Sequence, residues 1–255
     1  MMVAPSLTLS ALAGLPLIKP GDDLGALLIG ALRRARIVPQ DNDVLIVAQK
    51  VVSKAEGRIV DLKGVVPSAR AIAVGKEVNK DARLVEIILS ESSEIIRQKR
   101  DVLIVAHRLG FIMANAGVDQ SNVAGEDEQA LLLPIDPDAS AAALKAQLDR
   151  EFGVDIGVVV NDSFGRPWRF GVVGVALGAA GIPVLQNMVG VPDLFGRKMR
   201  VTEVAVADEI AAAASLLMGQ GAEGLPAVHL RGLNWNAPAA RASALLRPKD
   251  QDLFR

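Results

Sequence analysis

Cysteine and tyrosine are both absent from this 255-residue sequence, and only 3% of its residues are aromatic. Without cysteine, the chain can form no disulfide, no thiolate metal site and no cysteine nucleophile. Its 28 basic residues are balanced by 29 acidic residues. The sequence therefore provides neither the positive field nor the stacking platforms that nucleic-acid binding requires. We expect no nucleic-acid partner, and a core built from aliphatic side chains.

Long uninterrupted hydrophobic segments are also scarce. Residues 170–192 carry no charge and are long enough to cross a bilayer, but glycines and two prolines interrupt them. We interpret them as two buried strands joined by glycine turns. Residues 1–16 lack the basic start of a signal peptide. The sequence thus predicts a cytoplasmic protein with no membrane contact. The two histidines, His107 and His229, are far apart in sequence, and a structural role is expected for each.

The clearest chemical signal follows an apolar segment. Residues 156–160 contain only glycine and aliphatic side chains, which predicts a buried strand. The next three residues, Asn161, Asp162 and Ser163, all carry oxygen ligands, and Arg166 follows within a predicted turn. Oxygen ligands beside a guanidinium group at the end of a strand suit a metal-bound phosphate ester. The alternative is an ordinary turn with a surface ion pair.

Two further polar segments follow predicted strands. Residues 49–57 come directly after the apolar residues 44–48, and Lys50 and Lys54 lie four residues apart there. They could grip phosphate oxygens, although lysines at this spacing also make a solvated helix face. Residues 114–122 again offer carboxylate, amide and hydroxyl oxygens, which an Asx-turn would equally explain. Because both polar clusters that carry carboxylates follow probable strands, the sequence favours a shared metal site.

The remaining pattern alternates helices with strands. We predict helices over residues 23–35, 67–80, 82–97, 138–152 and 204–218, the fourth capped by Asp138 and stopped by Gly153, and the last capped by Thr202. Residues 219–224 have the glycine spacing of a dinucleotide fingerprint, but they leave a helix and enter a strand, which is the wrong context. No Walker sequence occurs either. The predicted fold is therefore mixed α/β, and neither a Rossmann nor a P-loop fold.

These segments together resemble one family, the gamma-glutamyl ligase that adds glutamate to coenzyme F-420, a deazaflavin. The resemblance rests on the following segments: residues 49–57, Ala114-Asn115-Ala116-Gly117-Val118-Asp119-Gln120-Ser121-Asn122, Asn161-Asp162-Ser163-Phe164-Gly165-Arg166, Ala207-Asp208-Glu209, Met218-Gly219-Gln220 and residues 228–233. It implies a GTP-dependent, metal-dependent ligase of unusual two-lobed α/β fold that acts as a homodimer. Residues 1–233 would form the catalytic domain, and residues 234–255 a mobile tail.

The resemblance also implies a set of site residues. Asp119 and Asp162 would hold one divalent ion, Mg²⁺ or Mn²⁺, and Ser163 and Gln220 a second, with K⁺ as a further expected ion. Lys54 and Arg166 would act in catalysis by neutralising charge and positioning the reactants. The expected GTP contacts are Leu15, Pro16, Leu17, Ile18, Gln49, Lys50, Lys54, Asn122, Met218, Gly219, Gln220, Gly221, Ala222, Glu223, Gly224 and Leu225.

The sequence departs from the expected family pattern at one place. Where the family is expected to show Gln-Thr-Asp, this chain has Val172-Val173-Gly174. A polar patch beside the predicted site has become apolar, and this bears on the deazaflavin acceptor more than on the nucleotide. The alternatives are the same ligase chemistry on a different acceptor, a metal-dependent phosphohydrolase that needs no L-glutamate, and a nucleotide-binding subunit without activity.

Overall fold

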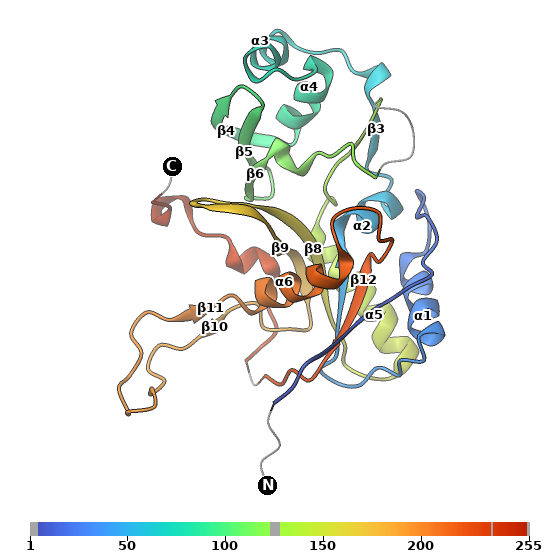
Figure 1. Ribbon diagram of the computed structural model, residues 1–255, viewed down its shortest axis with the longest axis vertical. Helices are drawn as coiled ribbons and strands as arrows, with labels where there is room; N and C mark the ends of the chain where they lie inside the picture. Colours follow the sequence, from blue (N-terminus) through green and yellow to red (C-terminus); the bar gives the residue numbers. More distant parts are fainter. Residues whose placement is uncertain (1–4, 123–127, 236, 254–255) are drawn as a thin grey trace.

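The computed structural model describes residues 5–122, 128–235 and 237–253, and it has a mixed α/β fold (Figure 1). Its main sheet has the strand order β1-β12-β2-β8-β9. These strands are β1 (Thr8–Ala11), β2 (Val44–Ala48), β8 (Gly157–Arg166), β9 (Arg169–Ala180) and β12 (Ala227–Arg231). Strands β2 and β8 pair in parallel, whereas the other neighbouring strands of this sheet are antiparallel. One parallel pair is not a doubly wound sheet, so the mixed α/β prediction is confirmed.

Six α-helices and three small sheets surround this sheet in the described ranges. The helices are α1 (Leu24–Arg34), α2 (Gln49–Ala55), α3 (Ala69–Val78), α4 (Ala82–Ser90), α5 (Pro137–Phe152) and α6 (Val206–Met218). The first small sheet joins β4 (Ser92–Lys99), β5 (Val102–His107) and β6 (Ile112–Ala114); the others pair β3 (Ile59–Asp61) with β7 (Gln129–Leu131), and β10 (Gln186–Asn187) with β11 (Glu203–Val204).

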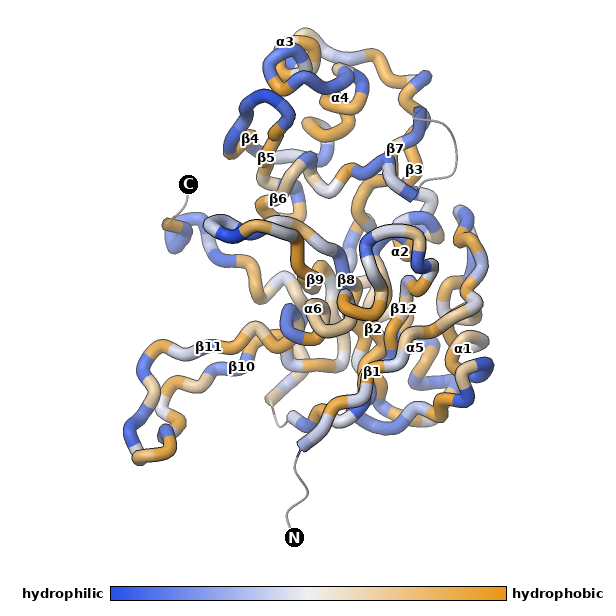
Figure 2. Tube along the Cα trace, viewed as in Figure 1, coloured by the Kyte–Doolittle hydropathy of each residue, from blue (hydrophilic) through white to orange (hydrophobic). Residues whose placement is uncertain are grey.

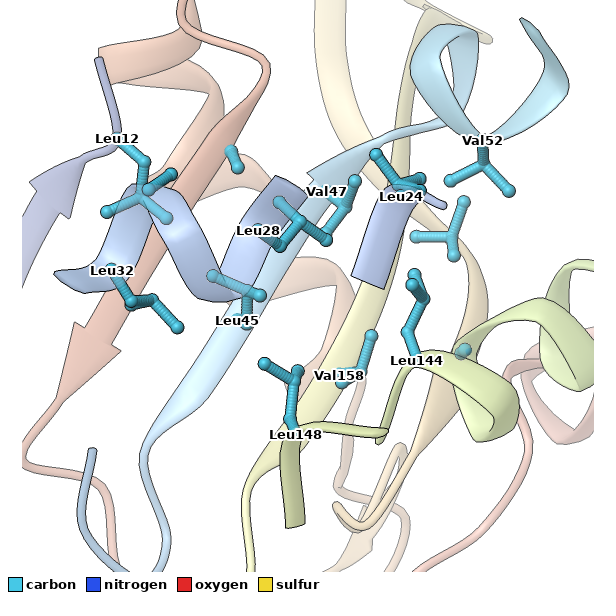
Figure 3. Close-up of a cluster of buried hydrophobic side chains, with 14 of the residues drawn as sticks. Leu12, Leu24, Leu28, Leu32, Leu45, Val47, Val52, Leu144, Leu148 and Val158 are labelled. Carbon is cyan, nitrogen blue, oxygen red and sulfur yellow. The ribbon is translucent and has the colours of Figure 1, made fainter. Parts of the chain in front are cut away.

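Side chains alternate along each strand, and both faces of β2 and of the first half of β8 are buried. Leu45 and Val47 of β2 face α1 and α5, where they pack with leucines such as Leu28 and Leu148 (Figure 3). Val44 and Ile46 face the opposite side and pack in the cluster that includes α6. This double covering explains why residues 44–48 and 156–160 read as continuous apolar segments.

A separate apolar cluster lies at one end of the molecule, where Figure 1 shows α3, α4 and β4–β6 gathered together. Val85 and Ile88 of α4 pack there against Leu103 and Val105 of β5. At another side, β10 and β11 form an arm that projects from the body, and Figure 2 shows hydrophobic residues along it. Leu194 and Phe195, near its end, have exposed side chains.

Several predicted boundaries are wrong. The helix predicted over residues 82–97 ends at Ser90, and residues 92–99 form β4 instead, because Ile95 and its neighbours pair with β5. The strand predicted over 156–160 continues to Arg166, so Asn161 and Ser163 lie within β8 rather than in a turn. Residues 170–180 belong to one long strand, β9, which pairs with β8 as a hairpin.

The predicted helix ends are partly confirmed. Helix α5 ends at a left-handed Gly153 as expected, but Asp136, not Asp138, caps its start. The Asp138 side chain is buried and accepts hydrogen bonds from the backbone N–H groups of Ala179 and Ala242. Helix α6 starts after Ala205, which makes no side-chain cap, so Thr202 does not cap it. A local aspartate thus caps α5, and α6 starts without a side-chain cap.

Two further expectations concerned membrane contact and the C-terminal tail. None of the helices described in residues 5–253 is both long and apolar enough to cross a bilayer. Of the tail predicted to be mobile, residues 242–245 form a 3₁₀ turn that packs on the body, and Ala242 is fully buried. The predicted domain start at residues 1–4, position 236 and the last two residues of the tail lie outside the described residues.

Candidate active site

A cavity of about 530 Å³ opens where β2 ends beside the middle of the parallel strand β8. Ala48, the last residue of β2, pairs with Asn161 of β8. The chain then enters α2 directly from β2, whereas β8 continues as one arm of a hairpin. Because neighbouring parallel strands send their following segments to the same edge of a sheet, such edges are common ligand sites.

The cavity brings together almost all the predicted site residues. The predicted residues that line it are Leu15, Pro16, Leu17, Ile18, Gln49, Lys50, Lys54, Asp119, Asn122, Asp162, Ser163, Met218, Gly219, Gln220, Gly221, Ala222, Gly224 and Leu225. These residues come from five separate segments of the chain. The two exceptions are Glu223 and Arg166.

Glu223 lies in the glycine loop after α6 but does not line the cavity. Its carboxylate accepts a hydrogen bond of 2.8 Å from the backbone N–H of Gly221, and so it folds the loop on itself. Hydrogen bonds from its own backbone N–H and from that of Gly221 lower the pKa of the carboxyl group. Gly219 has a φ of 70°, and a side chain there would overlap the Glu223 carboxylate. The glycine at position 219 is therefore required by this fold of the loop.

Two lysines of α2 project into the cavity from one face of the helix, as their spacing of four residues requires. Lys50 Nζ lies 2.6 Å from Asp119 Oδ2 and donates a 2.7 Å hydrogen bond to Ser121 Oγ. Lys54 Nζ donates a 2.6 Å hydrogen bond to the carbonyl oxygen of Asn122. Burial and the charge of Lys50 lower the pKa of Lys54. The lysines thus line the cavity rather than a solvated face.

The two predicted metal-binding carboxylates have opposite pKa shifts. Burial acts to raise the pKa of Asp119, but the Lys50 ammonium and the Ser121 donors outweigh it and hold that pKa below its usual value. Burial raises the pKa of Asp162 to about 6, and the nearby Asp119 charge adds to the effect, while Ser163 and Lys50 oppose it. A proton or a cation on Asp162 therefore relieves a charge that the site itself does not fully balance.

Strand alternation places Asp162 and Ser163 on opposite faces of β8. Asp162 lies on the side of Lys50, within reach of its charge. The Ser163 hydroxyl instead donates a 2.8 Å hydrogen bond to Gln220 Oε1, in the loop that follows α6. The structure therefore brings Ser163 and Gln220 into direct contact, and it brings Asp119 and Asp162 into one cavity.

Three polar residues of the cavity were not among the residues expected to bind nucleotide or metal. Ser121 donates from its N–H and hydroxyl to Asp119. Asn161 Nδ2 donates to Ser215 Oγ at 3.1 Å, and Ser215 donates in turn to the Ala211 carbonyl. Asn161 Oδ1 is buried without a hydrogen-bond partner in the described structure. The polar segments 114–122 and 161–169 contain the first two, but an alanine-rich helix offers no sequence signal for Ser215.

The structure does not bring Arg166 to this cavity. Because β8 continues past Asp162, Arg166 lies four residues further along the strand, about 13 Å at 3.3 Å per residue. There it lines a second cleft, and its guanidinium donates to the carbonyl of Phe170 at 3.4 Å. Arg166 was predicted to lie in a turn just after the oxygen ligands, whereas it is the last residue of β8.

The donor set suits a hard divalent cation, although in the described residues no three His, Cys, Asp or Glu side chains gather as a metal cluster. Asp119 and Asp162 supply two carboxylates, and Ser163 and Gln220 supply neutral oxygens. Mg²⁺ typically takes one or two protein carboxylates, with waters and phosphate oxygens as the remaining ligands. These residues therefore fit a cation that is bound together with a phosphate-bearing ligand.

The fold and the cavity define a mixed α/β protein with a large, oxygen-lined and lysine-flanked cavity where the parallel pairing of β2 with β8 ends. Sequence comparison then gives the family. The profile of F420-0:Gamma-glutamyl ligase matches residues 14–232, and the chain belongs to this family. The resemblance found in the polar segments is confirmed.

Relatives similar over nearly the whole chain are named coenzyme F420:L-glutamate ligase. The one from Methanothermobacter thermautotrophicus is 45% identical over 251 residues, which cover 98% of this chain and 99% of that protein. The relative from Methanopyrus kandleri is 43% identical over 93% of each chain. That from Archaeoglobus fulgidus is 43% identical and covers 95% of this chain and 94% of its own.

Proposed function

We propose that this protein is a GTP-dependent ligase that joins L-glutamate to the carboxylate of a deazaflavin acceptor, the precursor of coenzyme F-420. The observation that carries the proposal is the cavity, which gathers lysines, carboxylates and a glycine loop from five segments of the chain. Relatives that are aligned over nearly their full length bear the name of this ligase. The choice of GTP over other nucleotides, the use of K⁺ and the homodimer rest on the family resemblance.

The nucleotide phosphates would lie between α2 and the loop after α6. Lys50 and Lys54 approach this space from α2, and the backbone of residues 218–225 approaches from the other side. Two ammonium groups offset much of the phosphate charge, and bare glycine backbone allows the loop to come close. In this proposal the 119–122 segment, which both lysines hold, closes the same space.

Asp119 and Asp162 would hold one divalent ion, and Ser163 with Gln220 a second. When bound, such ions neutralise the phosphate oxygens and make the γ-phosphorus more electrophilic. The chain contributes the orientation of these ligands. Asp119 is held in place by Lys50 and Ser121, and Ser163 is held by Gln220.

The reaction needs no nucleophile from the protein, in agreement with a chain that has no cysteine. A carboxylate oxygen of the acceptor attacks the γ-phosphorus of GTP; an O–P bond forms and the bond to GDP breaks. The amine of L-glutamate then attacks the acyl carbon, a C–N bond forms, phosphate leaves and the amine loses a proton. The protein's part is to position the reactants and to neutralise their charge, which are the main catalytic terms in such transfers.

The test is a product assay with GTP, Mg²⁺ or Mn²⁺, L-glutamate and the deazaflavin acid. We expect one glutamyl mass to be added per cycle, with GDP and phosphate in equal amounts, and we expect hydroxylamine to trap the acyl phosphate as a hydroxamate. GTP hydrolysis that proceeds equally fast without acceptor and L-glutamate, and leaves no amide, would instead establish a phosphohydrolase.

A further inference from the structure

A second cleft of about 670 Å³ lies beside the cavity, between the β8–β9 hairpin and the first turns of α6. Much of its wall is apolar, with Phe164, Val173, Val175 and Val204 among the lining residues. Polar groups enter at a few points only: Arg166 from β8, and Asp208 and Glu209 from α6. An apolar cleft of this size with a few converging polar groups has the character of a small-molecule site.

The cavity and the cleft share a boundary. Ser163 of β8 lines the cavity, and Gly174, its pairing partner on β9, lines the cleft. On α6, Ser215 lines the cavity and Ala212 lines the cleft, and three residues along a helix span about 4.5 Å. A molecule that places a carboxylate against Ser163 at this boundary can therefore extend the rest of its body into the cleft.

The polar groups of the cleft have unused hydrogen-bonding capacity. Arg166 Nε is buried without a hydrogen-bond partner in the described structure, and the guanidinium makes one long bond, to Phe170. A guanidinium in this condition suits an anionic group such as a carboxylate or a phosphate. Asp208 uses Oδ1 to accept the Ala176 N–H at 2.9 Å, and the carboxylates of Asp208 and Glu209 can accept from ligand hydroxyl groups.

We infer that this second cleft binds the body of the acid acceptor, with apolar rings or chains against Phe164 and Val173 and an anionic group on Arg166. This inference rests on the proposed function and adds the place of one substrate to it. L-Glutamate fits the cleft poorly, because it would fill little of the volume and has only a short methylene chain to cover the walls. Gly174, at the departure from the expected family pattern, also lines this cleft.

The test compares Arg166→Gln with Arg169→Gln. Arg169 pairs with Arg166 across the hairpin but is exposed and lines neither the cavity nor the cleft, so it is a matched control. We expect Arg166→Gln to raise the KM for the acceptor about tenfold or more, as loss of a charge-assisted contact does. The KM values for GTP and L-glutamate should stay within about twofold of those of the unmodified protein.

Binding without turnover gives an independent readout. Calorimetric titration of the deazaflavin acid should show binding that is weakened in Arg166→Gln and in Val173→Trp, which narrows the cleft, while GDP binding is retained in both. Retained GDP binding also shows that the variants fold.

If the unmodified protein makes the amide but Arg166→Gln and Val173→Trp bind the acceptor normally, the inference is wrong and the proposed function stands. A rise in the KM for L-glutamate alone would assign the cleft to the amino acid and overturn the inference. Absence of acceptor binding to the unmodified protein would also overturn it.

Discussion

At the scale of single residues, the site depends on how each charge is balanced. Lys50 compensates Asp119 directly at 2.6 Å, whereas Asp162 has no such partner among its described contacts and keeps a raised pKa near 6. The two carboxylates therefore have different tasks in the proposed site. Asp119 is already ionised and oriented, and Asp162 is the group that gains most from a cation.

The first residue-scale prediction follows from this difference. Asp162→Asn keeps the shape of the side chain but removes its charge. We expect the Mn²⁺ affinity in the presence of GDP to fall by at least about tenfold. Loss of a residue that only hydrogen-bonds a metal ligand already lowers metal affinity by about tenfold or more, and Asp162 would be a ligand itself. For the unmodified protein, affinity should also fall as the pH drops below about 6, because a proton then competes for Asp162. Calorimetric titration at pH 8 and at pH 5.5 measures both effects.

The control for this experiment is Asp208→Asn. Asp208 also has a raised pKa caused by burial, but it lines the second cleft and accepts a hydrogen bond from Ala176 N–H. The Mn²⁺ affinity of the Asp208→Asn variant should match that of the unmodified protein. Equal metal affinity in Asp162→Asn and Asp208→Asn would remove Asp162 from the proposed metal site.

At the scale of elements, the contact of α6 with the β8–β9 hairpin fixes the position of the cavity relative to the second cleft. Gly174 of β9 is buried under α6, and a Cβ at this position would overlap both Ser215 Oγ and the Ala211 carbonyl. Ser215 in turn holds Asn161 at the cavity. The apolar departure at residue 174 thus has a packing reason in this chain, and an aspartate there would displace the helix.

This contact predicts that Gly174→Ala lowers the free energy of unfolding. A serine hydroxyl can rotate away, but the Ala211 carbonyl belongs to the helix backbone, so α6 must shift, at a cost of about 1–3 kcal/mol. Gly165→Ala, on the paired strand with nothing within 4 Å of the added carbon, is the matched control and should change stability little. Urea unfolding of both variants measures the difference. Equal effects of the two substitutions would contradict the proposed close packing of α6.

At the scale of the whole molecule, both histidines are buried away from the cavity and hold elements together, as their isolation in the sequence suggested. His229 Nε2 lies 2.7 Å from Asp43, at the opposite end of β2. His107 Nδ1 accepts the Leu109 N–H, and its Nε2 lies 3.4 Å from Glu91. Burial lowers the pKa of His107 to about 4, with the charges of Arg108 and Arg58 adding to the effect and Glu91 opposing it.

The stability of the molecule should therefore depend on the protonation of His107. Between pH 6.5 and 4 the unfolded chain protonates this side chain while the folded chain does not, so stability is lost as the pH falls through this window. From pH 7.5 to 5 the loss amounts to about 2 kcal/mol. Asp162, whose folded-state pKa is raised, acts in the opposite direction, so the test must isolate His107.

His107→Asn isolates this effect, because the asparagine oxygen can still accept the Leu109 N–H. We expect the variant to be less stable than the unmodified protein at pH 7.5 but to lose about 2 kcal/mol less on acidification to pH 5. Urea unfolding at both pH values measures the two free energies. A stability difference that stays constant between pH 7.5 and pH 5 would show that His107 does not titrate in this way.

The sequence by itself determined the mixed α/β class, the central strands and the polar segments of the cavity. Strands that are buried on both faces must be continuously apolar, and residues 44–48 and 156–160 were recognised as strands by this property. Residues 49–57 and 114–122 stand out because oxygen ligands and lysines follow such apolar segments. These are local properties of the chain, and local composition is enough to recognise them.

Only the tertiary structure decided where those segments meet. Whether β8 ends at residue 160 or continues to Arg166 depends on its pairing with β9. Because of this pairing, Arg166 lines the second cleft and not the cavity. Ser215 reached the cavity, and Asp138 became a buried acceptor, through contacts with residues far away in sequence. Strand pairing and helix packing join distant segments, and so no local pattern can specify them.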